Sequence, residues 1–184
     1  KIRIIQSVWD ESKKKDGLVL SEQTNIALNH CHGRWAIYLQ ADDALHEDEH
    51  QIIRKRIQEE DSLDQSQQAE GFMFRYLHFY GGYQLIQRKW DWYPSEIRIV
   101  RRNSGAQSFG DAQTFRGENN RILDTKNINA YVFHYGHARE PEKMVNKINY
   151  FHRFWHGDNH KIKVDKPYRT ELRDLVWFWG SHPV

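Results

Sequence analysis

Apolar and polar positions along the chain change period several times, and this predicts a mixture of strands and helices. Five segments show the alternation or the short apolar runs of β-strands, at 1–6, 35–39, 71–80, 96–101 and 130–134. Three segments carry apolar stripes at helical spacing and predict helices at 21–32, 47–60 and 141–155. Strands that alternate with helices favour an α/β domain.

The pattern also predicts the position of several side chains within these elements. We expect Ser21 to cap the first helix, and Ile52, Ile53 and Ile57 to face inward from the second. Even-numbered positions of the strand at 71–80 should share one face. An aromatic tail at 168–184 is expected to close over the rest. No internal repeat or linker divides residues 1–184, so the sequence predicts a single domain.

Composition and charge narrow the possible functions. The 27 basic side chains are nearly balanced by 25 acidic ones, for a net charge of +2, so the chain has no broad positive field for nucleic acid. Cys31 is the lone cysteine, which excludes a disulfide framework and a cysteine-based zinc site and fits a cytoplasmic setting. Because the chain opens within an apolar run, we expect further residues before Lys1.

Side chains that commonly bind metal ions follow two of the predicted strands. Asp42 and Asp43 come after the run at 35–39, and His134 ends the strand at 130–134. In open α/β sheets, ligands bind beyond the carboxyl ends of strands. Two carboxylates and an imidazole there would suit Mn²⁺ or Mg²⁺. Taken singly, the Asp pair also fits a helix cap and turn, and a lone His also fits a satisfied core position.

A longer pattern around these residues resembles a known enzyme family. Its parts are Asn25-x-Ala27-Leu28, Gly33-x-Trp35 and Tyr38-Leu39-Gln40-Ala41-Asp42-Asp43. Together they are similar to the central segment of GT-A glycosyltransferases, in which a helix with Asn-x-Ala precedes a strand ending in a metal-binding D-x-D motif. Gln40 stands here in place of the first acid of that motif. Three later segments resemble the acceptor half of bacterial members, namely Tyr93-Pro94-x-Glu96-Ile97-Arg98, Gly110-Asp111-Ala112 and His134-Tyr135-Gly136.

This resemblance implies a fold and an activity. The fold would be a Rossmann-like mixed sheet flanked by helices, with the first, donor-binding strands lying before Lys1. The activity would be inverting transfer of a sugar from a nucleotide-diphosphate donor to a glycan or other hydroxyl acceptor, assisted by Mn²⁺ or Mg²⁺. Polysaccharide synthesis in the cytoplasm, with peripheral association at the inner face of a bacterial membrane, would suit such an enzyme.

The same resemblance suggests catalytic roles. Inverting transfer needs a carboxylate that takes the proton of the acceptor hydroxyl. Asp111 is the first candidate, because a Gly-flanked loop can present a carboxylate to a cleft, although Asp is also common in plain turns. Glu96 is the second candidate, and it could instead form a structural ion pair with Arg98 or Arg101.

Substrate contacts are expected from charged and aromatic residues nearby. The candidates for neutralising diphosphate oxygens or an anionic acceptor are Arg98, Arg101, Arg139 and Lys143. Gln40 is a further candidate for a substrate contact. Trp92 and Tyr93, together with Trp90, are candidates for a platform under the acceptor. Most surface Arg and Lys side chains are merely solvated, so the sequence alone leaves that alternative open.

Two other functions fit the same residues. A metal-dependent hydrolase would use Asp42, Asp43 and His134 to activate water instead of a sugar hydroxyl. A non-catalytic sugar-binding module would be a relative that has lost the acid at Gln40 and its donor pocket.

Overall fold

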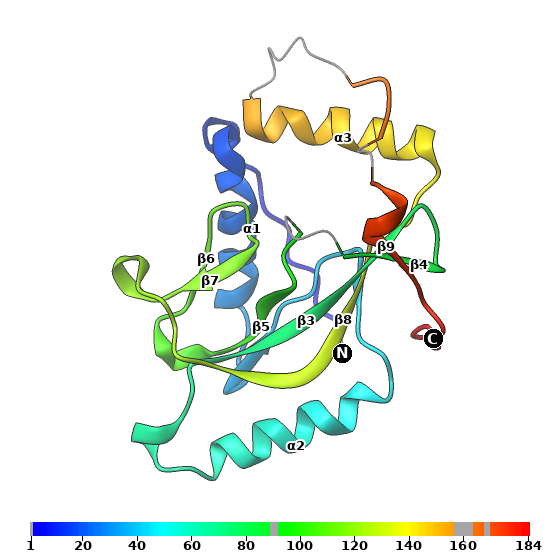
Figure 1. The fold of residues 1–184 in the computed structure, drawn as a ribbon. Coiled ribbons are helices and arrows are strands. Elements are labelled where there is room, and N and C mark those ends of the chain that lie inside the picture. The colour runs from blue at the N-terminus through cyan, green and yellow to red at the C-terminus, as the bar shows by residue number, and fades with distance from the viewer. Residues whose placement is uncertain (1, 89–91, 157–163, 168–169) are drawn as a thin grey trace.

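The computed structural model describes residues 2–88, 92–156, 164–167 and 170–184, except for the side chains at 11 and 153–156. The chain forms a mixed α/β fold, with a curled mixed sheet and helices packed against it (Figure 1). The α/β class predicted from the sequence is therefore confirmed. Over these described ranges the α-helices are α1 (Leu18–Asn29), α2 (Glu49–Asp61) and α3 (Pro141–His156). Short 3₁₀ turns lie at Glu11–Lys13, Lys15–Gly17, Gln65–Gln67, Arg102–Ser104, Glu118–Asn120 and Leu172–Asp174.

Strand β3 (Gly71–Tyr80) is the centre of the sheet. It pairs in parallel with β8 (Thr125–His137) along one edge and antiparallel with β5 and β4 along the other. The outer strands are β1 beyond β5, β9 beyond β4, and β2 beside β8. The bounds of these shorter strands are β1 Trp35–Ile37, β2 Asp43–Ala44, β4 Leu85–Gln87, β5 Ser95–Arg101 and β9 Leu175–Trp177. A separate hairpin consists of β6 (Gln107–Phe109) and β7 (Thr114–Arg116).

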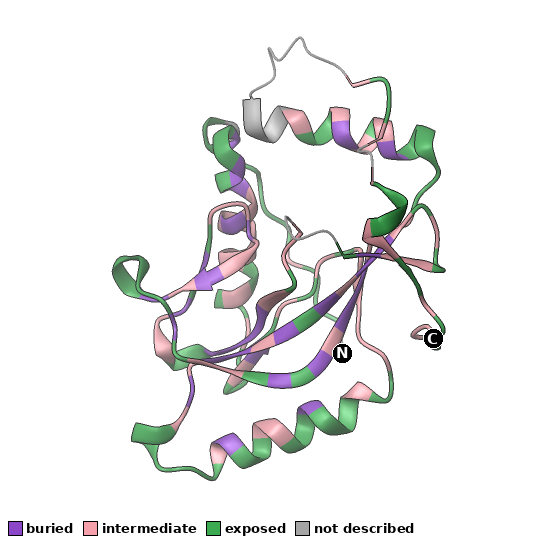
Figure 2. Cartoon of the chain, viewed as in Figure 1, coloured by how far each residue is buried: buried purple, intermediate pink, exposed green. Residues whose placement is uncertain are grey.

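Each face of the sheet has its own apolar cluster. Phe72, Phe74 and Ile99 form one cluster, against which α2 packs Ile53 and Ile57. The other cluster is covered by α1 and by the β6–β7 hairpin, and its buried residues are Ala36, Ile97, Val100, Ala106, Phe115 and Leu123. Figure 2 shows the buried positions concentrated along the central strands between these layers. Burying side chains on both faces of β3 and β5 removes a large apolar area from water, which is the main stabilising contribution.

Three details of the predicted helices are corrected. Helix α1 begins at Leu18, directly after Gly17 with φ +70°, so Ser21 lies inside the helix and its hydroxyl donates to the Leu18 carbonyl at 2.9 Å. Ser21 is therefore no N-cap. In α2, Ile53 is buried but Ile52 is 41% exposed, because adjacent residues point about 100° apart around a helix and Ile53 and Ile57 are the pair that faces the sheet.

The N-terminal strand predicted at 1–6 is also wrong over the described residues. Ile2 and Ile4 are 97% and 83% exposed, and residues 2–10 have no regular structure. No described strand pairs with this segment, and a strand without a hydrogen-bonded neighbour has no ladder to hold it.

Helix α3 and the C-terminal tail lie against the end of the sheet at which β8 finishes (Figure 1). Met144 and Ile148 of α3 are buried, whereas Phe151 is 37% exposed. In the tail, the rings of Phe178 and His182 pack on Phe79 of β3 with centroid distances of 5.2 and 5.0 Å. The tail thus covers this end of β3, as the sequence predicted.

Candidate metal centre and its cavity

Pairing of β2 with β8 brings the predicted metal-type residues together. In the antiparallel register, Asp43 lies opposite His134, and the Nδ1 atom of His134 is 2.8 Å from Asp43 Oδ1. Asp42 Oδ1 lies 4.0 Å from the same nitrogen. Ligand atoms of all three side chains lie within 4.8 Å of one another. The convergence predicted from the sequence, across 91 positions for the hydrogen-bonded pair, is confirmed, and the group could hold a metal ion.

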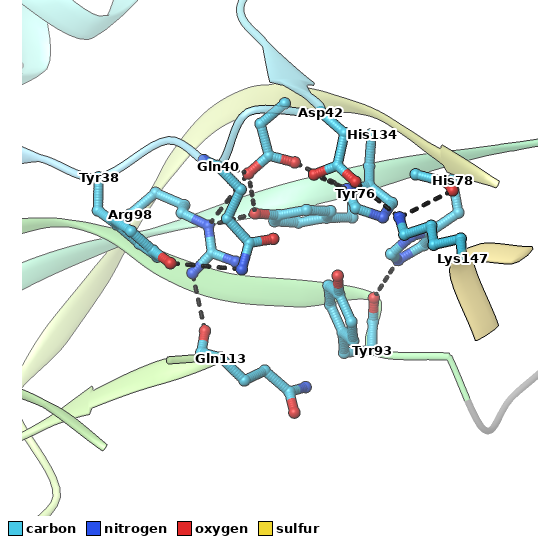
Figure 3. Close-up of polar contacts among 12 residues, drawn as sticks. Tyr38, Gln40, Asp42, Tyr76, His78, Tyr93, Arg98, Gln113, His134 and Lys147 are labelled. Carbon is cyan, nitrogen blue, oxygen red and sulfur yellow. Dashed lines mark hydrogen bonds and ion pairs between the residues drawn. The ribbon is translucent and has the colours of Figure 1, made fainter. Parts of the chain in front are cut away.

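Asp43 is the buried anchor of this group. Its side chain is 0% exposed, and its Oδ2 accepts hydrogen bonds from the Tyr76 hydroxyl and the Gln40 backbone N–H, both at 3.2 Å. Arg98 Nε lies 3.9 Å from the same oxygen and also donates to the Tyr76 hydroxyl. Figure 3 shows Tyr76, Arg98 and His134, the labelled partners in this group, with the contacts as dashed lines. With its oxygens taken by protein donors, Asp43 orients the His134 ring, as the carboxylate partners of metal-binding histidines do.

The other ring nitrogen of His134, Nε2, lies beside Gly136. A β-carbon built on Gly136 would clash with His134 Nε2 and would lie 2.9 Å from Asp42 Oδ2, so both atoms face the space beside the Gly136 Cα. Only glycine leaves that space open. The hydrogen bond to Asp43 fixes Nδ1 and leaves Nε2 as the atom that can bind a cation. One imidazole nitrogen and one carboxylate oxygen fit a transition-metal ion such as Mn²⁺ better than an all-oxygen site would.

Lys147 of α3 is the fourth member of the centre. Its Nζ lies 2.9 Å from Asp42 Oδ2 and donates to the Gly136 carbonyl at 3.0 Å. Burial acts to raise the pKa of Asp42, but the hydrogen bond and charge of Lys147, with the charge of His134, outweigh it, so the pKa lies below its ordinary value. Asp42 is therefore ionised at neutral pH and is available to a cation.

A cavity of about 890 Å³ opens in front of Asp42 and His134. Asp111, Gln40, Arg139 and Lys143, all candidates from the sequence, line the same cavity. Aromatic side chains complete its wall, from Trp9, Tyr38, Tyr150 and Phe151. Six of the predicted site residues therefore share one space, although they come from segments spread over a hundred positions.

Asp111 is presented to this cavity by the loop of the β6–β7 hairpin. The residues on either side of it, Gly110 and Ala112, have φ angles of +62° and +66°. A left-handed backbone is unfavourable for alanine, and such conformations are concentrated at functional sites. The hairpin is attached to α1 by Asn25, whose amide donates to the Ser108 carbonyl at 3.2 Å and accepts from the Ser108 N–H at 2.7 Å.

The structure places Arg98 elsewhere than predicted. Its side chain is 0% exposed, lies between the rings of Tyr38 and Tyr76, and donates through Nη1 to the carbonyls of Ile97 and Gln113. It does not reach the cavity, so its predicted contact with substrate is wrong. The physical reason is that the Tyr76 hydroxyl accepts from Nε and two carbonyls accept from Nη1, which holds the guanidinium inside the sheet, although Nη2 is buried without a hydrogen-bond partner.

Glu96 is likewise absent from the cavity wall. Its carboxylate accepts a hydrogen bond from Gln113 Nε2 at 2.8 Å rather than forming the expected ion pair with Arg98 or Arg101. Burial raises its pKa above the ordinary value, and the charge of nearby Asp111 adds to that shift. Of the two predicted bases, Asp111 is the one that faces the cavity.

The predicted acceptor platform is also not in this cavity. Trp92 lines a different cavity of about 880 Å³, together with Arg75 and Tyr131. Tyr93 packs its ring against Tyr76, with centroids 5.0 Å apart. The Tyr93 ring lies 6.5 Å from the His134 ring and the Trp92 ring 5.2 Å from the His78 ring, centroid to centroid, so both rings border the candidate centre. Trp90 lies outside the described residues.

Two further histidines surround His134. The His78 and His137 rings lie 5.2 and 6.1 Å from it, centroid to centroid. Burial lowers the pKa of His78 to about 4 and that of His137 to about 3, so both rings are neutral at pH 7. They enclose the centre without adding charge.

Sequence reasoning missed three contributors, Lys147, Tyr76 and Asn25. Lys147 lies eight residues after Arg139 and four after Lys143, a spacing that predicts one helical face and could have identified it. The motif containing Asn25 was recognised, but the motif gives no partner for its amide. Tyr76 was assigned only to a strand face.

Comparisons with known proteins add no family to this picture. Neither a scan against protein-family models nor a search of curated proteins found a match to the chain. Among the described residues, no helix has the length and apolar character to cross a bilayer.

Proposed function

We propose that this chain is the catalytic domain of a GT-A-type glycosyltransferase that moves a sugar from a nucleotide-diphosphate donor to a hydroxyl acceptor with the help of Mn²⁺ or Mg²⁺. The observation that carries the proposal is that Asp42, His134 and Asp111 line one cavity together with Arg139 and Lys143. A cation-binding pair, a free carboxylate and two basic side chains are the groups that such a transfer needs. The resemblance in the segment from Asn25 to Asp43 adds independent support.

Each residue then has a defined task. Asp42 Oδ and His134 Nε2 would hold the cation, and Asp43 keeps the imidazole in place. When bound, a divalent ion supplies positive charge beside the departing diphosphate. Asp111 takes the proton from the acceptor hydroxyl as its oxygen bonds to the anomeric carbon, and the bond from that carbon to the diphosphate breaks with its electron pair leaving on the diphosphate. Arg139 and Lys143 stabilise the negative charge that remains.

The proposal is tested with the protein in its full natural length. It is incubated with Mn²⁺, a panel of nucleotide-sugars and a panel of glycan acceptors, and products are followed by mass spectrometry. We expect an acceptor whose mass rises by one sugar residue, and we expect Asp111→Asn to lose at least about a hundredfold of this turnover. Donor binding by the variant should be preserved.

Other outcomes point to the rival functions. Release of free sugar or phosphate with no modified acceptor would make the chain a hydrolase. Tight glycan binding that is unaffected by EDTA, without any turnover, would make it a sugar-binding module. Near-normal transfer by Asp111→Asn would remove Asp111 from the role of base.

A further inference from the structure

Lys147 occupies the position at which the candidate centre would bind a cation. Its ammonium contacts two oxygens, Asp42 Oδ2 at 2.9 Å and the Gly136 carbonyl at 3.0 Å. The ion pair is partly buried, since the two side chains are 21% and 23% exposed. Of the three acid and imidazole side chains in the centre, Asp42 offers the carboxylate that faces the cavity.

The ammonium and a divalent ion would need the same oxygen. Asp42 Oδ2 is the atom that faces the Gly136 Cα beside His134 Nε2, and it is the oxygen that Lys147 already holds. Asp43 is no substitute, because its oxygens accept hydrogen bonds from His134, Tyr76 and Gln40 and its side chain is fully buried. A cation that binds between Asp42 Oδ2 and His134 Nε2 would therefore displace Lys147 from that oxygen.

The neighbouring lysine of α3, Lys143, has a different environment from Lys147. Lys143, one turn earlier, is 69% exposed and pairs with Glu140 at 3.4 Å. It lines the same cavity but forms no ion pair with Asp42 among the described contacts. The ion pair with Asp42 is therefore a specific feature of Lys147 and not a general effect of a basic helix.

We propose that Lys147 is a built-in competitor of the divalent cation, holding Asp42 neutralised while the centre is empty and leaving it when the cation binds. This rests on the cation site of the proposed function. The four-carbon stem of lysine is flexible, so the ammonium can leave Asp42 and stay on the wall of the same cavity, where the donor diphosphate would lie. Cation binding alone is then weak, and an anionic donor that pairs with the released ammonium strengthens it.

The test measures Mn²⁺ binding to the full-length protein without donor, by electron paramagnetic resonance of free Mn²⁺ and by calorimetry. We expect Lys147→Gln to bind Mn²⁺ about tenfold more tightly than the natural protein, because an ion pair that leaves Asp42 free one time in ten lowers the apparent affinity by that factor. Lys147→Arg, which keeps the charge, should bind as weakly as the natural protein. Lys143→Gln removes one positive charge from the same wall without touching Asp42, and it should change the affinity less than about twofold.

Asp42→Asn separates failure of this inference from failure of the cation site. If Asp42→Asn abolishes Mn²⁺ binding and Lys147→Gln binds no more tightly than the natural protein, the competition is refuted and the site stands. If Asp42→Asn binds Mn²⁺ normally, or neither the natural protein nor Lys147→Gln binds it, the proposed cation site is itself wrong. An equal gain for Lys147→Gln and Lys143→Gln would also refute the inference, since general electrostatics would explain it. Circular dichroism confirms that each variant is folded.

Discussion

Replacing Asp43 with Asn removes a buried charge while almost preserving the shape of the side chain. Asp43 and Arg98 are both 0% exposed, and Arg98 Nε lies 3.9 Å from Asp43 Oδ2. Asp43 also accepts hydrogen bonds from His134, Tyr76 and Gln40. An Asn amide has one acceptor oxygen and one donor NH₂ group, so at least one of these donors loses its acceptor.

The expected loss of stability can be worked out from this geometry. Removing one partner of a buried ion pair costs about 3–5 kcal/mol, because the other charge stays buried without compensation. The Tyr76 hydroxyl also bonds Arg98, so we take the lower end, about 3 kcal/mol. For a domain of this size, each kcal/mol shifts the melting temperature by about 2–4 °C. Asp43→Asn should therefore lower Tm by roughly 6–12 °C.

Asp42→Asn is the matched control for this measurement. It is the adjacent residue with the same chemical change, but its ion pair with Lys147 is about one-fifth exposed and should be worth no more than about 1 kcal/mol. Thermal denaturation is followed by circular dichroism at pH 7 for the natural protein and both variants. A Tm for Asp43→Asn that is no lower than that for Asp42→Asn would refute the assignment of Asp43 as the buried anchor of the centre.

Two other substitutions test the parts that surround it. Gly136→Ala places a methyl group against His134 Nε2, so we expect Mn²⁺ affinity measured by calorimetry to fall more than about tenfold. Gly82→Ala, whose methyl group makes only an ordinary contact of 3.5 Å with Gln84 Oε1, should leave the affinity unchanged. Asn25→Ala removes both hydrogen bonds to Ser108 and should cost about 1–2 kcal/mol in urea denaturation. Faster hydrogen exchange of the Ser108 amide would show that the β6–β7 hairpin has loosened, and unchanged exchange would contradict this role.

The strands with clear local signals were predicted well. The strand predicted at 71–80 has the same bounds as β3, because its alternation is regular and two glycines follow it. The helix predicted from Pro141 begins at Pro141. In contrast, β2 has only two residues, Asp43 and Ala44, and such a short strand has no periodicity to detect. It forms because β8 offers an open edge, which is a property of the assembled sheet.

The meeting of Asp43 and His134 was predicted, but from a different geometry. We expected the carboxyl ends of two strands of one open sheet to coincide. In the structure, Asp42 and Asp43 lie beyond β1 and reach His134 through antiparallel pairing of β2 with β8. The burial of Arg98 could not be predicted, because alternation places it on a strand face without revealing that a Tyr76 hydroxyl lies within reach.

The balance of charged side chains in the candidate centre connects two features that are far apart in the sequence, the glutamine at position 40 and Lys147. Asp42 and Asp43 bring two negative charges to the centre, and Arg98 and Lys147 bring two positive ones within 4 Å of them. The charges of these four side chains therefore balance, and a third carboxylate at position 40 would add a partly buried negative charge without compensation. Binding of a divalent ion would raise the net charge of these side chains and the ion together from zero to +2. A nucleotide diphosphate carries the compensating charge, so under the proposed function cation and donor stabilise each other's binding, and the centre is built to bind them together.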